Sequence, residues 1–328
     1  MFSKSSLPFL ALAVMLSAGE SGMAGPPHPQ TFSIVAADPE RGEVGVAVAS
    51  RFFAVGTVVP HAKAGVGAVA TQSFANTTYG PRGLELLERG LEPAEVLDVL
   101  IRNDEGKDQR QVGIVSASGN SVTYSGKGCL AWAGGRQGPN YAAQGNILTG
   151  EEVVEAMEAS FLSSEGKPLA ERLYQALKAG EDAGGDSRGK QSAALLVVRD
   201  SAGYGGFTDL AVDIRVDDHT EPMAELGRLL ELALVNDHWN RGWTAFTEKR
   251  FSEALEWQER TAERAEGGKT MLPEVLYDLA VIRLANDDKA GALEALQRAV
   301  KLNPKLIGQA QEDGDLEALG EALQKLDD

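Results

Sequence analysis

The sequence contains one cysteine, Cys129, and four histidines among 328 residues. A single thiol cannot form an internal disulfide, so stability must come from core packing. The histidines are scattered and no paired cysteines accompany them, so no zinc motif is present, and we expect no metal or other cofactor. Positive charge is also scarce, because 31 Lys and Arg face 48 Asp and Glu, for a formal net charge of −17. Such a surface repels phosphate backbones, so we expect no nucleic-acid partner.

Long hydrophobic runs are missing as well. The most apolar segment, Leu7–Ala18, has 12 residues, whereas a membrane-spanning helix needs about 20. Lys4 precedes this run, and small residues stand at the −3 and −1 positions of a cut before Gly25. We therefore predict a signal peptide over residues 1–24, a protein that does not span the membrane, and export to the periplasm or the extracellular space. An uncleaved anchor is the alternative.

After a proline-rich leader at residues 25–30, strand patterns begin. Thr31–Ala37 and Glu43–Ser50 are apolar, β-branched runs joined by the turn sequence DPERG, which predicts a hairpin. In the second run three valines alternate with glycine and alanine, which indicates a sheet buried on both faces. We also predict strands at Thr57–Pro60, Gly65–Thr71, Gln111–Ser116, Val122–Ser125, Ser192–Val198 and Leu210–Val216.

Helical patterns separate these strands. Leucines recur at helical spacing between Leu84 and Ile101, where Gly90 and Pro93 predict a split into two helices. Two further amphipathic helices are expected at residues 151–162 and 168–179. Because hairpins dominate, we predict an α+β domain over residues 31–219, with two sheets and helices packed outside them.

From residue 220 to 328 the pattern is entirely helical. Small and apolar residues fall at the positions of the 34-residue tetratricopeptide pattern, namely Leu279, Ala280, Ala292, Leu296, Ala299 and Pro304. A weaker copy lies upstream around Ala254, and the flanking segments 222–235 and 316–326 are expected to cap the pair. An unrelated pair of helical hairpins is the alternative. Such repeats predict a protein or peptide partner bound in their groove, and a homodimer is compatible with the pattern.

Five strings in the first domain carry a family resemblance: TFSIVAADPERGEVGVAVASRFFAVGTVVP, AGVGAVATQS, YGPRGLELL, QGNIL and GDSRGKQSAALLVV. Together they resemble the domain of unknown function 1028 family, from about Thr31 to His219. The resemblance implies membership of the Ntn-hydrolase superfamily and a four-layer αββα sandwich, and it implies no substrate. In some members a module proposed to bind peptidoglycan follows this domain, where this chain has the repeat-like helices.

An Ntn hydrolase uses the side chain of its own first residue as nucleophile and its free α-amine as base. Thr31 stands where the resemblance places that residue, at the head of the first strand. Lys63, 32 residues later, matches the lysine that tunes the amine in proteasome-type enzymes. The alternatives are a threonine that merely starts a strand and a lysine on a surface turn. A cut before Gly25 leaves six residues ahead of Thr31, so catalysis requires a second processing step.

Further candidates for substrate binding lie at strand ends. The polar run at residues 185–192 offers Asp186 and Arg188 to position an amide or carboxylate, with Gln191 and Ser192 as hydrogen-bond donors. The equal alternative is that Asp186 and Arg188 pair with each other and fix the loop. The remaining candidates are Ser50, Arg51 and Asn146, the last as an oxyanion donor or a turn residue. Two hypotheses follow: an exported amide hydrolase, or a non-catalytic binder that uses both domains for interaction.

Overall fold

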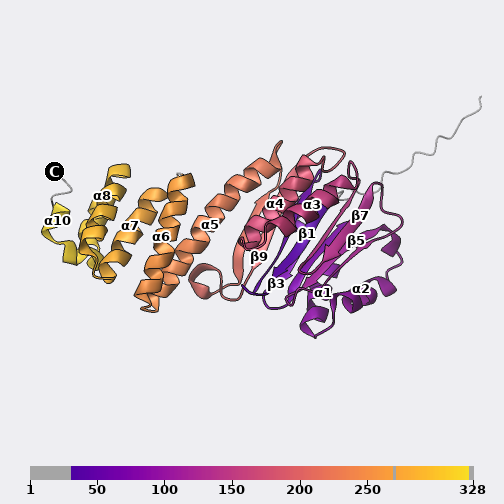
Figure 1. Ribbon diagram of the computed structural model, residues 1–328, viewed down its shortest axis with the longest axis horizontal. Helices are drawn as coiled ribbons and strands as arrows, with labels where there is room; N and C mark the ends of the chain where they lie inside the picture. The colour runs from indigo at the N-terminus through magenta and orange to yellow at the C-terminus, as the bar shows by residue number, and fades with distance from the viewer. Residues whose placement is uncertain (1–30, 269–270, 325–328) are drawn as a thin grey trace, which may run out of the picture.

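The computed structural model describes residues 31–268 and 271–324, so the predicted signal peptide, the predicted leader and residues 325–328 lie outside the described residues. It shows a mixed α+β region with two antiparallel sheets, followed by a row of helices (Figure 1). Among the described residues, no helix is both long enough and apolar enough to cross a bilayer.

The larger sheet has six strands in the order β10-β9-β2-β1-β8-β7. Its bounds are β1 Thr31–Asp38, β2 Glu43–Ser50, β7 Ala133–Gly138, β8 Tyr141–Asn146, β9 Ser192–Val198 and β10 Leu210–Val216. The smaller sheet has the order β3-β4-β5-β6, with β3 Pro60–Lys63, β4 Gly67–Ser73, β5 Arg110–Ser116 and β6 Ser121–Ser125. Every pairing is antiparallel, and the β1–β2 and β5–β6 hairpins are confirmed.

The two sheets pack face to face, and helices cover their outer faces (Figure 1). Val44, Val46 and Val48 of β2 fill the core between the sheets. The opposite face of β2 carries small residues because helix α4 lies close: a Cβ on Gly45 would come within 2.9 Å of a methyl carbon of Leu173. The alternation of valine with small residues therefore fits one strand between two packed layers.

Helices α3 (Glu152–Ser163) and α4 (Leu169–Asp182) pack on the six-stranded sheet. Helices α1 (Tyr79–Glu88) and α2 (Pro93–Arg102) pack on the four-stranded sheet, and they are separate, as predicted. Between β2 and β3 the expected strand Thr57–Pro60 is wrong. A 3-10 turn, η1 (Val55–Thr57), forms there because Ala54 adopts a left-handed backbone and the amides of Thr57 and Val58 bond to the carbonyls of Ala54 and Val55.

The helical region begins with α5 (Pro222–Thr247), whose first half packs against β9 and β10 through Met223, Leu226 and Leu230. It continues with α6 (Phe251–Gly268), α7 (Leu272–Ala285), α8 (Lys289–Leu302) and α9 (Leu306–Glu312). The expected capping helix at 316–326 is instead a 3-10 turn, η4 (Gly314–Leu319), followed by α10 (Glu321–Gln324). Gly320, whose φ is +42°, separates these two short elements.

Candidate functional site

Thr31 is the first residue of β1 and is fully buried. Strand register aligns it with Ser50 of β2, and aligns Ser50 with Ser192 of β9. The Thr31 hydroxyl lies 3.2 Å from the Ser50 hydroxyl oxygen, to which it donates. Three hydroxyl side chains on neighbouring strands therefore form a row at one end of the six-stranded sheet.

The main chain of Thr31 is held by two side-chain amides. Gln72, near the end of β4, donates to the Thr31 carbonyl oxygen at 3.1 Å, and Asn146, the last residue of β8, does so at 3.4 Å. Both amides also donate to the side-chain oxygen of Gln111 on β5, at 2.8 and 2.9 Å. Gln111 in turn donates to the carbonyl of Gly145 at 2.7 Å. This amide network joins the two sheets without using any charge.

The network continues inward through Ser33 of β1 and Gln144 of β8. Ser33 donates to the Gln72 side-chain oxygen at 2.5 Å, and Gln144 donates to the Ser33 hydroxyl at 2.7 Å. All of these side chains are buried. Because an unpaired buried amide is costly, their pairing fixes how the sheets meet beside Thr31.

Sequence reasoning missed Ser33, Gln72, Gln111 and Gln144. They could have been found from the two-residue period of a strand, which shows which side chains face the core. Gln72 falls in phase with Ala68 and Ala70, which face the core between the sheets. A glutamine at an inward position of a buried strand requires a hydrogen-bond partner in the core, and it therefore marks a buried polar network.

The loop before β9 is tied to the end of β2 by Asp186, a buried carboxylate. Asp186 accepts hydrogen bonds from the backbone N–H of Arg51 and of Arg188, each at 2.9 Å. The Arg188 guanidinium also forms an ion pair with it at 2.8 Å. The expected pairing of Asp186 with Arg188 is therefore present. Their role in holding a substrate stays a prediction.

The remaining loop candidates lie on either side of these Asp186 contacts. The Arg51 guanidinium donates to the carbonyl of Lys190 at 3.1 Å. Ser192 donates to the carbonyl of Phe52 at 2.5 Å and accepts from the N–H of Val55, so it shapes the segment after β2. Gln191 instead bonds to Asp218, beyond the end of β10, and is not part of the amide network.

Lys63 lies at the end of the smaller sheet opposite to Gln72. It pairs with Gly67 at the start of β4, whereas Gln72 lies five residues further along. At about 3.3 Å per residue, this places the two positions about 16 Å apart. The Lys63 ammonium is half-exposed and forms an ion pair with Glu88 of α1. The structure therefore does not bring Lys63 next to Thr31.

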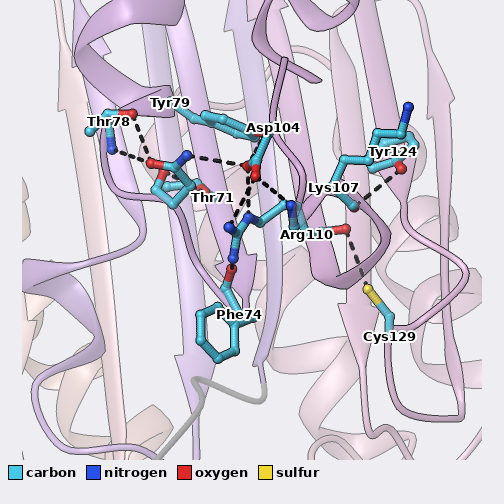
Figure 2. Close-up of polar contacts among 11 residues, drawn as sticks. Thr71, Phe74, Thr78, Tyr79, Asp104, Lys107, Arg110, Tyr124 and Cys129 are labelled. Atoms are coloured by element: carbon cyan, nitrogen blue, oxygen red, sulfur yellow. Dashed lines mark hydrogen bonds and ion pairs between the residues drawn. The ribbon is translucent and has the colours of Figure 1, made fainter. Parts of the chain in front are cut away.

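A charged cluster flanks the network where β5 begins (Figure 2). Asp104 accepts hydrogen bonds from the Arg110 guanidinium at 2.9 Å and from the Tyr79 hydroxyl at 2.6 Å. The bond from Arg110 is the main reason that the pKa of Asp104 is well below its usual range. Burial, and next the bond to Asp104, raise the pKa of the Tyr79 hydroxyl. Because Arg110 directly precedes Gln111, this cluster anchors one end of the amide network.

Cys129 touches the same cluster through its sulfur, 3.3 Å from the carbonyl oxygen of Arg110 (Figure 2). Burial raises the pKa of this thiol, so it stays protonated near neutral pH. A protonated thiol is a poor nucleophile, which favours a structural role for Cys129.

Three large apolar side chains are exposed on segments at this end of the sheets. Phe53 follows β2, Phe74 follows β4, and Leu130 precedes β7, with exposed fractions of 64%, 36% and 59%. The carbonyl of Leu130 accepts from the N–H of Ile147, directly after Asn146. We call Phe53, Phe74 and Leu130 the apolar rim. Exposed aromatic and aliphatic side chains grouped beside a polar site are typical of ligand-binding surfaces.

Comparison with known proteins gives three findings. No curated protein matches this chain. A crystal structure of protein SPO2555 from Silicibacter pomeroyi is similar, with 30% sequence identity and a TM-score of 0.57. The match covers 62% of this chain and 86% of that one. The profile of a family of unknown function, DUF1028, matches residues 31–226, from the head of β1 into α5. The chain therefore belongs to the DUF1028 family.

Proposed function

We propose that the protein is an exported hydrolase of the Ntn type that cleaves an amide bond with Thr31 once residues 1–30 have been removed. The observation that carries the proposal is the position of Thr31: the first residue of a central strand, with Ser50 within reach of its hydroxyl. Two sheets with helices on both outer faces fit the four-layer αββα sandwich of that superfamily.

In the proposed reaction the α-amine of Thr31 takes the hydroxyl proton as the hydroxyl oxygen attacks the amide carbonyl carbon. The C–N bond then breaks, and the leaving nitrogen receives that proton. Water attacks the resulting ester, the amine again acts as base, and the acid product leaves with Thr31 restored. Ser50, whose hydroxyl oxygen accepts from Thr31 at 3.2 Å, holds the Thr31 side chain in place until the hydroxyl hydrogen turns to the amine.

Gln72 and Asn146 are positioning residues in this proposal, because both hold the Thr31 carbonyl rather than the reacting atoms. A neutral surrounding also suits an amine base. The ordinary pKa of an α-amine is about 8, and a nearby carboxylate would raise it, so that less of the free base is present at neutral pH. The apolar rim indicates a substrate with an apolar group next to the scissile amide.

The test is the intact mass of the protein purified from its native host. The proposal expects a chain that begins at Thr31 and gains one acyl group from a β-lactone, which opens as the threonine oxygen attacks its carbonyl. In Thr31→Ala acylation falls at least about 100-fold, and Thr31→Ser keeps it. Thr220→Ala, an exposed threonine beyond β10, is the matched control. A mature chain that begins before Thr31, or equal acylation of Thr31→Ala, would contradict the proposal.

A second candidate function is a non-catalytic binder that holds a peptide against the helices. Two observations favour it. Five of the six residues that define the repeat pattern, Leu279, Ala280, Ala292, Leu296 and Ala299, are buried between helices, whereas Pro304 is exposed after α8. A groove of about 440 Å³ is lined by Trp239, Trp243, Asn236 and Asn240 of α5, together with Tyr204 and Gly205 from the segment between β9 and β10. The asparagine side-chain amides can bond a peptide backbone.

Co-purification of the full chain separates this candidate from the hydrolase. Asn240→Ala is expected to lose a bound peptide, while Asn303→Ala, at the end of α8, is the control. Removing residue 220 onward is not a suitable test, because Met223, Leu226 and Leu230 belong to the core that covers β9 and β10. A partner that binds both variants equally would contradict peptide binding in this groove.

A further inference from the structure

A cavity of about 340 Å³ lies where the α+β region meets the helices, at the end of the sheets away from Thr31. One wall is apolar and includes Pro168 before α4, Val197 of β9 and Leu234 of α5. The other wall carries charge from the β1–β2 turn, the start of β2, the residue after β9, α5 and α6. Cavities of this size that combine an apolar wall with a few polar groups are typical of small-molecule sites.

Four arginines and two carboxylates line the charged wall, in a protein whose overall charge is −17. Arg199 pairs with Glu43 at 2.7 Å and with Asp237 at 3.3 Å. Arg241 pairs with the same two carboxylates, at 3.8 and 2.9 Å. The two positive and two negative charges of these four residues cancel. The positive charge of the wall therefore exceeds its negative charge by the two other arginines, Arg41 and Arg260.

Arg260 forms no ion pair with any residue that the structure describes. Its guanidinium carbon lies 5.0 Å from the ring centre of Trp257, which also lines the cavity. Arg41 differs, because Asp38 pairs with it at 2.6 Å. Arg260 is thus the cation of the wall that is available to an incoming anion.

His238 adds a hydrogen-bonding atom to the same wall. Its Nδ1 is buried and has no hydrogen-bond partner among the described residues. Burial lowers the pKa of His238, so the ring is neutral near pH 7. A buried polar atom without a partner is uncommon in a folded protein, so the hydrogen-bonding capacity of this wall is not fully used within the described chain.

We propose that this cavity binds a small carboxylic acid with an apolar body. The carboxylate pairs with the Arg260 guanidinium, and the apolar body packs between Val197 and Leu234. A guanidinium offers paired N–H donors that match a carboxylate. Because β9 belongs to the sheets and α6 to the helical region, the bound acid touches both regions and stabilises their junction.

Isothermal titration calorimetry on the full chain tests the proposal with three probes: phenylacetate, 4-methylpentanoate and the neutral amide phenylacetamide. We expect at least one acid to bind one-to-one with a dissociation constant below about 1 mM. Phenylacetamide has nearly the same shape as phenylacetate but no charge, so it is expected to bind at least about tenfold more weakly than that acid. This comparison needs no altered protein.

Arg260→Gln is expected to weaken binding of the acid about tenfold and to leave the melting temperature of the free protein unchanged, because the side chain is exposed. Arg260→Lys restores the charge and part of the affinity. Arg298→Gln, on α8, is the matched control and is expected to bind like the original chain. The proposal is wrong if neither acid binds below about 10 mM, if phenylacetamide binds as well as phenylacetate, or if Arg260→Gln keeps full affinity.

Discussion

The two ends of the sheets hold their buried polar groups in different ways. At the end that contains Thr31, neutral amides and hydroxyls bond to one another between the sheets. At the opposite end buried carboxylates such as Glu43 and Asp237 pair with arginines, and these pairs join the sheets to α5. Neutral groups thus join the two sheets at one end, while charge holds two regions together at the other.

The difference has a physical basis in what each end must do. Ion pairs are directional but costly to bury, so they suit a junction where each charge has two partners. A neutral network imposes fixed positions on Thr31 without shifting the pKa of an adjacent amine. Charge at this end lies outside the amide network, in the Asp104–Arg110 pair (Figure 2) and in Asp186 of the loop before β9. This contrast supports the proposed chemistry at the Thr31 end and a structural junction at the other end.

The largest effect on stability is expected from Gln111→Leu. This change removes the side chain that accepts from Gln72 and Asn146 and donates to the carbonyl of Gly145. The partners remain buried with fewer hydrogen bonds, so the free energy of unfolding should fall by about 3 kcal/mol. Urea unfolding followed by circular dichroism measures the change.

Gln191→Leu is the matched control, because it makes the same chemical change at a site outside the amide network. Its expected effect is below about 0.5 kcal/mol. Equal losses of stability in the two variants would mean that the neutral network does not hold the sheets together at this end. The contrast between the two ends would then rest on the ion pairs alone.

A smaller, pH-dependent effect is expected from Asp104→Asn. Because Arg110 lowers the pKa of Asp104 in the folded state, the carboxylate contributes stability above its unfolded pKa of about 4. That contribution disappears as pH falls toward the folded pKa. The variant should therefore lose about 2 kcal/mol at pH 7, and the loss should shrink below pH 4.

Urea unfolding of both proteins at a series of pH values measures this difference. Asp98→Asn is the control, because its pair with Arg102 on α2 is exposed and should contribute less than about 0.5 kcal/mol. A loss for Asp104→Asn that stays constant from pH 7 to pH 3 would mean that ionisation of Asp104 does not stabilise the start of β5.

Much of the fold could be predicted from local patterns. Glu43–Ser50, Ser192–Val198 and Leu210–Val216 were predicted with the bounds that the structure shows, because each combines β-branched residues with clear turn signals. The split between α1 and α2 followed from Gly90 and Pro93. The hairpin of β7 and β8 was missed, since its sequence AGGRQGPNYAAQGN is rich in glycine and alanine. Its strands are held by pairing and by burial of Ala142 and Ala143, which local propensity does not report.

The candidate site could be predicted only in part. Thr31 was chosen because the family resemblance places the nucleophile there, whereas Ser50 and Ser192 were chosen because they lie at strand ends. The register places the three side by side. Asn146 was left between an oxyanion donor and a turn residue, and it joins the amide network. Gln72 and Gln111 lie on strands of the other sheet, so their approach to Thr31 depends on how the sheets stack. Spacing along the chain does not determine that stacking, and for the same reason the spacing of Lys63 does not bring it near Thr31.

The smallest effect is expected from Lys63→Ala. Its exposed pair with Glu88 contributes less than about 0.5 kcal/mol to stability, as surface ion pairs usually do. If Lys63 remains about 16 Å along the sheet from Gln72, the rate of Thr31 acylation should change by less than about twofold. Ser50→Ala, which removes the hydroxyl next to Thr31, should slow the same reaction about tenfold. A Lys63→Ala variant that is as slow as Ser50→Ala would show that the lysine reaches Thr31 in the processed chain. A charged side chain would then lie beside Thr31 during catalysis.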